Sequence, residues 1–364
     1  PKLNHYHRTG LLRGPHCPLP IAPRQWQTAP RAHTVVQLPP NQTELPGASS
    51  VPAPPHCPFP IAHCPLPIAL YPPPVYERLT RIDDLDDPRL EVYRDQRDAW
   101  LKAAHNPDAP GPTTRTGLDD PGLFMTEAAL VLDQHLRAPY PLESVLVATE
   151  RAAALADLLA RVPDSVPIYT APRAMLSEIA GFAMHRGLLA VGRRLPDRDP
   201  IELARSRRTL VMLEDIANHD NVGSIFRSTA ALVGDDGAVL LSPRSCDPLY
   251  RKALRVSIGC ALRVPFATLD PWIGGLETLR AMDIPIVALT PDPDATPIDQ
   301  IPDILGPSTP VALLLGAEGP GLSAPALARA THRVRIPIVD WVDSLNIGVA
   351  AGVALAALCR APLG

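Results

Sequence analysis

The sequence predicts a two-domain α/β protein whose second domain is a parallel sheet covered by helices. From residue 209 onward, short and almost purely apolar runs, beginning with TLVMLE, alternate with segments of helical periodicity. Strands this apolar are buried on both faces, as in a parallel sheet. A shorter alternation of the same kind occupies residues 123–192, and a length of 364 residues leaves room for two cores.

Composition limits the function classes. The formal net charge is -4 and the pI is near 6.3, so any nucleic-acid contact must come from local arginine clusters. Aromatic residues make up 4% of the chain, so base stacking is not expected to be the main binding device. No basic-then-apolar signal pattern opens the sequence, and no apolar run reaches membrane-spanning length. We therefore expect a soluble, cytoplasmic protein.

The first 75 residues differ in composition from the rest. They hold 19 of the 46 prolines and three copies of one repeat, HCPLPIA at 16–22, HCPFPIA at 56–62 and HCPLPIA at 63–69. This proline density is incompatible with helices or central strands. We expect residues 1–75 to be disordered or polyproline-like, and to come from a translated upstream repeat or a misplaced start. The six cysteines are scattered and match no standard zinc finger, which favours reduced thiols.

Residues 76–198 are predicted to form a small α/β domain with an N-terminal helical extension. A charged helical pattern, PRLEVYRDQRDAWLKAAH, is closed by the breakers NPDAPGP near residue 110. Beyond it, residues 123–136 have the periodicity of an amphipathic helix, and residues 187–192 that of a buried strand. Between these lie the strands SVLVAT and VPIYT and the helix RAAALADLLARV. The helix-compatible linker DPIELARSRR opens the second domain, residues 199–364.

The first polar motif is EDIANHDNVGSIFRSTA at 214–230, directly after an apolar strand, and NVGSIFR at 221–227 lies within it. Asn221 can cap the following helix, Gly223 allows close approach of another segment, and Arg227 offers a guanidinium fork to a phosphate. Taken alone, the segment is explained equally well without a ligand, with Asn221 as a helix cap and Arg227 as a solvated side chain. Its place after a strand is where ligands bind in open α/β sheets.

The second motif is LLLGAEGPGLS at 313–323, a buried strand that runs into three glycines around Glu318. Such glycines expose backbone amides and carbonyls to a ligand, as adenosine-binding loops require, and the lack of G-K-[ST] argues against a P-loop. A tight turn that carries a surface glutamate is the alternative interpretation.

The third motif is DSLNIGVAAGVALAAL at 343–358. From Ile347 onward every side chain is small or aliphatic, which predicts a helix buried on all sides. Ser344 and Asn346 stand at its start, where both can cap the first-turn amides. Because one cap suffices, two polar groups around Leu345 indicate a site. All three motifs follow strands, so we expect them to meet at one edge of the sheet.

In this order and spacing, NVGSIFR, GAEGPG and SLN resemble the N-x-G-x-x-x-R, G-x-E-G-x-G and S-L-N motifs of the SpoU (TrmH-type) branch of the SPOUT RNA methyltransferases. DPLYRKALRVSIGCALRVPF is similar to the segment that this family carries between its first two motifs. The resemblance covers roughly residues 205–360. HRGLLAVG at 185–192 resembles part of the L30e-like RNA-binding domain found in many members.

The resemblance implies an α/β catalytic domain whose carboxyl end is threaded into a trefoil knot. It also implies a homodimer formed through that region, S-adenosylmethionine bound in the knot, and methylation of a ribose 2'-hydroxyl in rRNA or tRNA. Cofactor contacts are implied for Thr290, Gly316, Ile336 and Leu345. Catalytic roles are implied for Asn221, Arg227, Glu318, Ser344 and Asn346.

Methyl transfer from a sulfonium requires two oriented reactants and a poorly acidic hydroxyl that loses its proton. A guanidinium is almost never neutral in a protein. Arg227 is therefore expected to bind the adjacent phosphate and stabilise the developing alkoxide, while a phosphate oxygen or water takes the proton. Asn221, Ser344 and Asn346 would position the ribose and Arg227. Glu318 would orient Asn221, Arg227 or the loop.

Other functions compatible with the motifs are a catalytically silent RNA-binding or assembly protein on the same fold and a SPOUT enzyme that modifies a base. A Rossmann-type nucleotide binder is disfavoured because no GxGxxG follows an early strand. No His or Cys grouping after the repeats indicates a metal. One departure from the family is Gly348, where many relatives carry Ser. Five arginines near the linker are candidates to follow an RNA backbone, namely Arg193, Arg194, Arg205, Arg207 and Arg208.

Overall fold

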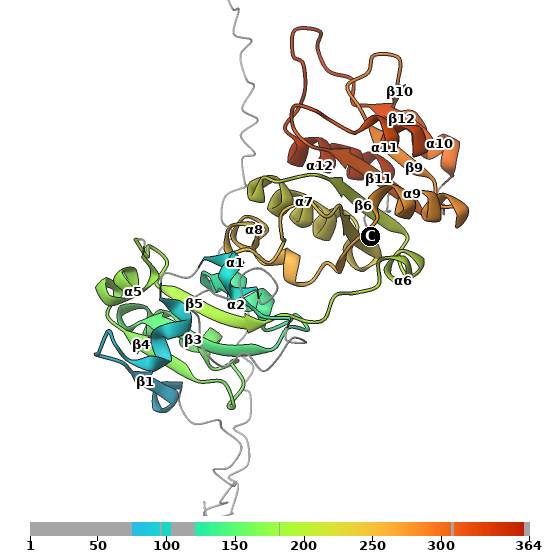
Figure 1. Ribbon diagram of the computed structural model, residues 1–364. Helices are drawn as coiled ribbons and strands as arrows, with labels where there is room; N and C mark the ends of the chain where they lie inside the picture. Colours follow the sequence, from blue (N-terminus) through green and yellow to red (C-terminus); the bar gives the residue numbers. More distant parts are fainter. Residues whose placement is uncertain (1–74, 95–96, 103–120, 182, 307–308, 360–364) are drawn as a thin grey trace, which may run out of the picture. The chain divides into compact units, whose positions relative to one another are not determined.

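The computed structural model describes residues 75–94, 97–102, 121–181, 183–306 and 309–359. This part of the chain contains two β-sheets with their helices (Figure 1). The segment predicted to be disordered, residues 1–75, lies outside the described residues except for Val75. The predicted end of the N-terminal helical extension near residue 110 also lies outside them.

The first sheet has five strands in the order β1-β4-β3-β5-β2. Strands β1, β4 and β3 run parallel, whereas β5 is antiparallel to both of its neighbours, β3 and β2. Alternate residues of β3 pack into separate clusters on the two faces, Val145 and Val147 into one and Leu146 and Ala148 into the other. The strands are β1 Leu79–Arg81, β2 Leu123–Glu127, β3 Leu142–Ala148, β4 Ile168–Ala171 and β5 Leu188–Arg193.

The helix predicted over residues 123–136 is wrong in its first half. Leu123–Glu127 form β2, which pairs with β5, and only Ala129–His135 form a helix, α2. Between them, Ala128 has a φ of 91°, a value that no right-handed helix contains. Pairing with β5 therefore overrides a local periodicity that cannot distinguish a short apolar strand from a helix.

The charged helical pattern upstream is not one continuous helix in the described residues. Pro88–Tyr93 form a 3-10 helix, η3, capped by Asp87, whose side chain accepts a hydrogen bond from Arg89 N at 2.9 Å. Asp98–Leu101 form a single α-helical turn, α1. The remaining short helices beside this sheet are η2 Val75–Arg78, α3 Thr149–Ala152, η4 Ala153–Leu155, α4 Ala156–Leu159 and α5 Arg173–Ala180. The predicted helix over RAAALADLLARV is therefore present as three short pieces, α3, η4 and α4.

The second sheet has seven strands in the order β10-β12-β9-β11-β6-β7-β8, and every neighbouring pair is parallel. The predicted parallel sheet is therefore confirmed. Two of its strands, β8 and β10, are short edge strands that the sequence pattern did not reveal. The strands are β6 Thr209–Glu214, β7 Gly237–Leu241, β8 Phe266–Thr268, β9 Ile286–Leu289, β10 Thr296–Pro297, β11 Val311–Gly316 and β12 His332–Arg335.

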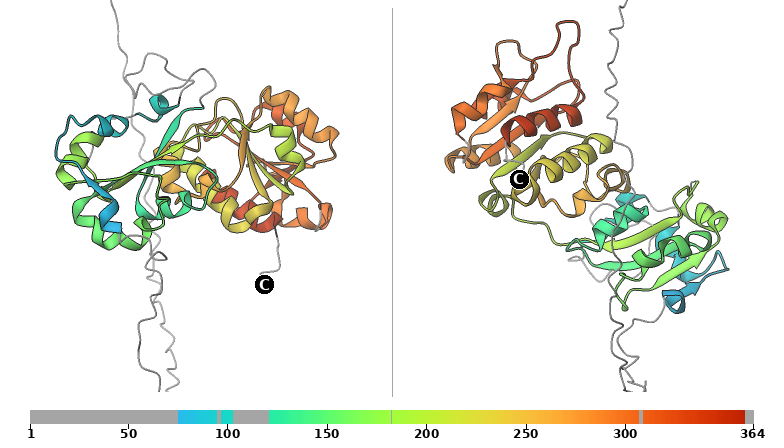
Figure 2. Two further views of the ribbon diagram at one scale, coloured as in Figure 1. Left: turned by 90° about the horizontal axis from the view of Figure 1, so that it is seen from below. Right: turned by 180° about the vertical axis from the view of Figure 1, so that it is seen from behind.

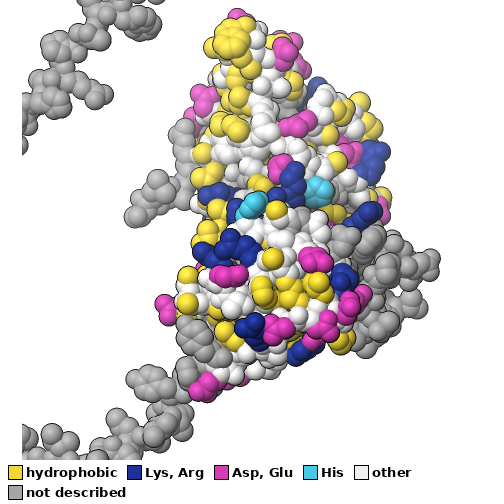
Figure 3. Space-filling view, turned by 90° about the vertical axis from the view of Figure 1, so that its left-hand side faces the viewer, with side chains coloured by type: hydrophobic (Ala, Val, Ile, Leu, Met, Phe, Trp, Pro, Cys, Tyr) yellow, Lys and Arg dark blue, Asp and Glu magenta, His cyan; other side chains and the backbone are white. Residues whose placement is uncertain are grey.

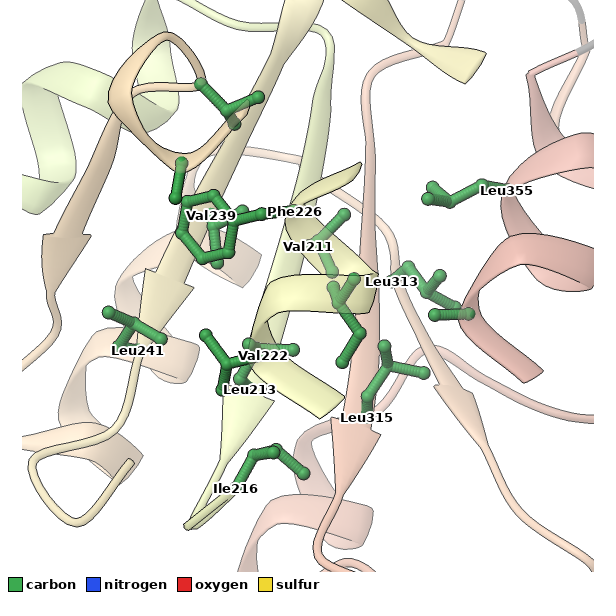
Figure 4. Close-up of a cluster of buried hydrophobic side chains, with 14 of the residues drawn as sticks. Val211, Leu213, Ile216, Val222, Phe226, Val239, Leu241, Leu313, Leu315 and Leu355 are labelled. Carbon is green, nitrogen blue, oxygen red and sulfur yellow. The ribbon is translucent and has the colours of Figure 1, made fainter. Parts of the chain in front are cut away.

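Helices cover both faces of this sheet (Figure 2). Val211 and Leu213 of β6 face α7, α8 and α12, and the intervening Leu210 and Met212 face α6, α9 and α11. Figure 4 shows Val222 and Phe226 of α7 and Leu355 of α12 among the strand residues of the cluster that contains Val211 and Leu213. The helices are α6 Pro200–Arg205, α7 His219–Leu232, α8 Arg251–Val256, α9 Trp272–Ala281, α10 Ile301–Leu305, α11 Ala324–Arg329 and α12 Ile347–Leu358, with the 3-10 turns η5 Gly234–Asp236, η6 Cys260–Leu262 and η7 Ile298–Gln300.

Helix α12 is not buried on all sides, contrary to the prediction. Ala351, Ala354 and Leu355 are buried against the sheet, whereas Val349 and Val353 are 55% and 41% exposed. The two valines are four residues apart and therefore share one helix face. In a single chain, α12 thus presents an apolar face that nothing in the described residues covers. Neither α12 nor any other helix within the described ranges is long and apolar enough to cross a membrane.

Candidate functional site

Four adjacent strands of the second sheet deliver the motif residues to one edge. The last residues of β6 and β11 are Glu214 and Gly316, while Thr290 follows β9 and Ile336 follows β12. Because all these strands are parallel, their carboxyl ends lie at the same edge. Strand β11 lies between β9 and β6, so the glycine loop that follows it starts from the middle of this edge.

The glycine loop turns back tightly on itself. Ala317 and Gly321 form an isolated antiparallel bridge. A Cβ atom at Gly316 would lie 2.4 Å from the backbone of Gly321, a separation that no side chain permits, so position 316 requires glycine. Gly319 and Gly321 have φ angles of 87° and 69°, in the left-handed region that glycine adopts without strain. The glycines therefore determine the conformation of this loop.

A cavity of about 700 Å³ lies against the glycine loop, between the loops that follow β9, β11 and β12. Apolar side chains, including those of Leu289, Leu322 and Ile338, share its lining with the glycine backbone, which is typical of small-molecule sites. All four residues that the resemblance assigns to the cofactor line the cavity, and so do three of the five assigned to catalysis. They are Thr290, Gly316, Ile336 and Leu345, together with Glu318, Ser344 and Asn346.

Asn346 connects the three motifs. Its Nδ2 donates to Asn221 Oδ1 at 2.9 Å and to Glu318 Oε1 at 3.0 Å. Its Oδ1 accepts from the backbone N atoms of Gly348 at 3.0 Å and Val349 at 3.3 Å, so Asn346 is the predicted N-cap of α12. The cap fixes the orientation of the amide, because only Oδ1 can accept from backbone N–H groups. Both the nitrogen and the oxygen of the Asn346 side-chain amide are therefore hydrogen-bonded.

Asn221 lies inside α7 rather than at its start. The N-cap is Asn218, whose side chain accepts from Asp220 N at 2.9 Å, so the predicted capping role of Asn221 is wrong. The helix begins before Asn221, which places this side chain on the face of α7 that meets α12. Asn221 is 4% exposed and its Oδ1 accepts from Asn346. Its Nδ2 has no hydrogen-bond partner within the described ranges and can donate to a ligand.

Arg227 is outside this hydrogen-bonded cluster. It lies six residues after Asn221, about 9 Å along the axis of α7. The Arg227 side chain is exposed, and it forms no ion pair with any described residue. It lies close enough to Cys260 to oppose the effect of burial, which raises the pKa of that thiol. An exposed guanidinium without a carboxylate partner is available to a phosphate.

Ser344 lines the cavity but does not cap α12. It is exposed, and Asn346 accepts from the first-turn amides, so the predicted double cap is wrong for Ser344. At Gly348, a Cβ atom would lie 2.7 Å from Ser224 Oγ of α7. Ser224 therefore occupies the space that a side chain at position 348 would need.

The five arginines predicted to follow RNA have different surroundings. Arg194 is 7% exposed and its guanidinium contacts Asp247 at 2.9 Å, so it is not available to RNA and the prediction is wrong for this residue. Arg193 contacts Glu143 at 2.8 Å and remains partly exposed. Arg205, Arg207 and Arg208 lie at the amino end of β6. That end is opposite the edge that carries the cavity.

A further buried carboxylate, that of Glu214, lies at this edge; it begins the motif at 214–230, but the sequence predicts no role for it. Glu214 is 5% exposed and accepts hydrogen bonds from Trp272 Nε1 and from the backbone N and Oγ of Ser323. The one feature of the sequence that marks Glu214 is its position as the charged residue at the end of the apolar run TLVMLE. Among the residues that the structure describes, no group of three His, Cys, Asp or Glu side chains could hold a metal ion.

Comparison with known proteins places these features in a family. The model of the SpoU rRNA Methylase family matches residues 208–356. Proteins described as tRNA/rRNA methyltransferases from Mycobacterium bovis and Mycobacterium tuberculosis are each 37% identical over 273 residues, which cover 74% of this chain and 88% of theirs. A relative with the same description from Mycobacterium avium is 33% identical over 234 residues, which cover 62% of this chain and 73% of the relative.

Solved structures share the fold. An rRNA methyltransferase from Sinorhizobium meliloti gives a TM-score of 0.60 at 19% identity, covering 79% of this chain and 100% of its own. The same comparison with an AdoMet-bound form gives 0.59 at 20% identity and the same coverage. The SpoU methyltransferase AviRb from Streptomyces viridochromogenes gives 0.57 at 20% identity, covering 75% of this chain and 97% of its own.

The seven-stranded parallel sheet, with loops gathered at its carboxyl edge, defines an α/β fold of the class that these solved methyltransferase structures share. Within that class the assignment is more specific, because the relatives exceed 30% identity over most of their length. The chain belongs to the SpoU rRNA Methylase family of RNA methyltransferases. The α/β fold class predicted from the strand pattern and the family predicted from the three motifs are therefore confirmed.

Proposed function

We propose that this protein uses S-adenosylmethionine to methylate a ribose 2'-hydroxyl of rRNA or tRNA. The observation that carries the proposal is the Asn346 amide, which binds Asn221 and Glu318 together beside the cavity. Polar groups from three separate motifs are thus held at the place where the cofactor and a ribose would meet. The cited relatives are described as tRNA/rRNA methyltransferases, which supports RNA as the substrate class.

The cavity fits the cofactor. Its volume of about 700 Å³ falls within the usual range for small-molecule sites, about 300–1,000 Å³. Backbone groups of the loop from Gly316 to Gly321 face it, and Ile336 and Leu345 give it apolar walls for an adenine ring. Thr290 adds a hydroxyl at the end of β9. We assign cofactor binding to Thr290, Gly316, Ile336 and Leu345.

The bound cofactor supplies a methyl group on a positively charged sulfur. The chain must orient the ribose and favour the charged form of its 2'-oxygen. We assign the orienting roles to Asn221, through its unused Nδ2, and to Ser344 at the cavity wall. Asn346 and Glu318 hold Asn221 and the glycine loop in place. Arg227 binds the adjacent phosphate and stabilises the developing alkoxide, while a phosphate oxygen or water accepts the proton.

We propose that catalysis and binding of the RNA substrate belong to two different domains of the chain. Residues 199–364 form the methyltransferase domain, and residues 76–198 form an L30e-like domain that binds the RNA substrate. The mixed sheet of β1 to β5, with a cluster of its own on each face, supports a separate folding unit for the second role. The relatives' description as tRNA/rRNA methyltransferases supports action where those RNAs are modified, and we propose the cytoplasm.

We further propose a homodimer formed through a trefoil-knotted carboxyl region. Besides Val349 and Val353 of α12, the loop before that helix exposes Val339 to 56% and Trp341 to 85%. Figure 3 shows hydrophobic side chains at the upper end of one face, level with this loop in Figure 1. Exposed apolar patches of this kind mark association surfaces. Light scattering should give the mass of two chains for the wild type and of one chain for Val349→Lys/Val353→Lys.

The experiment that tests the proposed activity is transfer of a labelled methyl group from S-adenosylmethionine to total RNA from a strain that lacks the gene. Digestion to nucleosides then separates 2'-O-methylated ribose from methylated bases. Label in a 2'-O-methyl nucleoside supports the proposal. Label in a base would indicate a different SPOUT activity, and cofactor binding without transfer would indicate a silent RNA-binding protein.

A further inference from the structure

Glu214 is a buried carboxylate that, among the residues the structure describes, accepts hydrogen bonds only from uncharged donors. It is the last residue of β6 and is 5% exposed. Its Oε1 accepts from Ser323 Oγ at 2.7 Å and from Trp272 Nε1 at 3.1 Å, and its Oε2 accepts from Ser323 N at 2.9 Å. Burial of a carboxylate costs free energy that such donors offset only when their geometry is good. An apolar residue would fill this position without that cost.

These contacts hold the exit of the glycine loop. Ser323 directly follows Leu322, which lines the cavity, and it is the N-cap of α11, accepting from Ala326 N at 3.3 Å. The entrance of the loop is held as well, because Gly316 is paired with Glu214 in the β11–β6 register. Glu214 therefore holds both ends of the loop. Its backbone is paired with Gly316 at the entrance, and its side chain is hydrogen-bonded to Ser323 at the exit.

The third contact joins Glu214 to α9. Trp272, the first residue of that helix, packs against the hydrophobic cluster that Leu210 and Met212 of β6 form with α6, α9 and α11. Its indole N–H therefore ties the Glu214 carboxylate to α9 through Oε1, the oxygen that also accepts from Ser323 Oγ. The arrangement aims both carboxylate oxygens at Ser323.

We propose that Glu214 is a positioning residue that keeps the loop between Gly316 and Leu322 in the conformation that binds S-adenosylmethionine. The role rests on the proposed function, since it concerns the cofactor of that site. Glu214 does not line the cavity, so it acts through Ser323 and not by contact with the cofactor. The same loop carries Glu318, which contacts Asn346, so loop position also affects the ribose end of the site.

The test measures the dissociation constant of S-adenosylmethionine by calorimetry with full-length protein, alongside thermal unfolding and hydrogen exchange of residues 317–323. Glu214→Ala removes all three hydrogen bonds, and we expect cofactor affinity to fall about tenfold or more. Glu214→Gln keeps the shape but can satisfy only part of the donor set, so its affinity should lie between those of the wild type and Glu214→Ala. Both variants should show faster exchange confined to the loop.

A matched control is available between the same two helices. Glu277 of α9 contacts Arg329 of α11 at 2.7 Å on the surface, so Glu277→Ala removes a carboxylate link without touching the loop. Its cofactor affinity should equal that of the wild type. Trp272→Phe removes one donor but leaves both Ser323 contacts, so it should lower thermal stability more than cofactor affinity.

The proposal is overturned if Glu214→Gln shows wild-type affinity and wild-type exchange of the loop. It is also overturned if Trp272→Phe and Glu214→Gln weaken binding equally for equal losses of thermal stability, because Glu214 would then act only through the stability of the domain. Failure of the wild type to bind S-adenosylmethionine would instead reject the proposed function. Loop exchange in the variants would still decide whether Glu214 holds the loop.

Discussion

The Asn346 amide donates to Asn221 Oδ1 at 2.9 Å and so joins the start of α12 to the first turns of α7. These residues are 125 positions apart in the chain. The same amide caps α12 through its oxygen. Asn346 therefore has a structural and a site-building role, and the two can be separated by substitution.

Asn346→Asp should preserve stability and abolish activity. An aspartate oxygen caps a helix about as well as asparagine, but the second oxygen would face Asn221 Oδ1 and the Glu318 carboxylate, where Nδ2 now donates. Loss of this donor and the added repulsion should lower the methylation rate by about 100-fold or more. Steady-state methylation and thermal unfolding measure the two effects.

The matched control is Asn218→Ala, which removes the cap of α7 away from the cavity. It should cost about 1 kcal/mol of unfolding free energy and leave the methylation rate close to that of the wild type. A fully active Asn346→Asp enzyme would contradict the role given to the Asn346–Asn221 contact.

Arg227→Lys should lose activity without losing the cofactor. Lysine keeps the positive charge but not the planar fork that binds two phosphate oxygens. We expect the methylation rate to fall by about 10- to 100-fold in Arg227→Lys and further in Arg227→Ala. Calorimetry should show unchanged binding of S-adenosylmethionine, because Arg227 is not part of the cavity lining. Weakened cofactor binding would place Arg227 in a different role.

Two glycines of α12 should respond to alanine with opposite signs. At Gly348 a Cβ atom would lie 2.7 Å from Ser224 Oγ, whereas at Gly352 it would lie 3.5 Å from Ser228 Oγ, an ordinary contact. Gly348→Ala should therefore destabilise the protein by about 1–3 kcal/mol. Gly352→Ala should stabilise it by about 0.5–1 kcal/mol through the helix propensity of alanine.

Removal of the Ser224 side chain should rescue the first of these variants. In Ser224→Gly/Gly348→Ala the new methyl group occupies the space that the serine leaves, so chemical denaturation should recover part of the lost free energy. Additive losses in the double variant would show that the Ser224–Gly348 contact does not limit the approach of α7 and α12.

The protein should become less stable as the pH is lowered, because of His135. This side chain is 1% exposed, and burial lowers its pKa from 6.5 to about 4. Below pH 6.5 the unfolded chain binds a proton that the folded chain does not, so the free energy of unfolding decreases as the pH falls toward 4. The full effect of one such group is about 3 kcal/mol. Above pH 7 it contributes no slope.

Denaturant titrations between pH 7 and pH 4 test this expectation. His135→Leu should remove that part of the slope, while His185→Leu, which changes an exposed histidine, serves as the control. An unchanged slope in His135→Leu would mean that other groups account for the acid sensitivity.

The sequence predicts the five central strands of the second sheet, but not its edge strands β8 and β10, because the central strands have a strong apolar pattern. Runs such as residues 209–214 and 311–316 are apolar at every core position, and polar or glycine residues mark their ends. The same logic placed Glu318 and Asn346 at one edge. The helix predicted over residues 123–127 was wrong because these residues form a strand by pairing with β5. That pairing is a long-range contact that local periodicity does not contain.

The finer features of the site depend on packing that one sequence does not reveal. The cap of α7 is Asn218 and not the predicted Asn221, because the helix begins three residues earlier than the motif at 221–227 indicates. Glu214 gave no specific signal, since its partners Trp272 and Ser323 lie 58 and 109 residues away. The exposure of Val349 and Val353 was unpredictable because an apolar association face and a core face have the same composition.

The central claim is that the chain methylates a ribose 2'-hydroxyl of rRNA or tRNA, and site-resolved mapping of 2'-O-methylation in cells tests it most directly. RNA from a strain lacking the gene is compared with RNA from strains carrying the wild type, Arg227→Ala or Asn346→Asp. We predict that 2'-O-methylation at a defined nucleotide disappears with the gene, returns with the wild type and remains absent with both variants. An identical 2'-O-methylation map with and without the gene would contradict the claim.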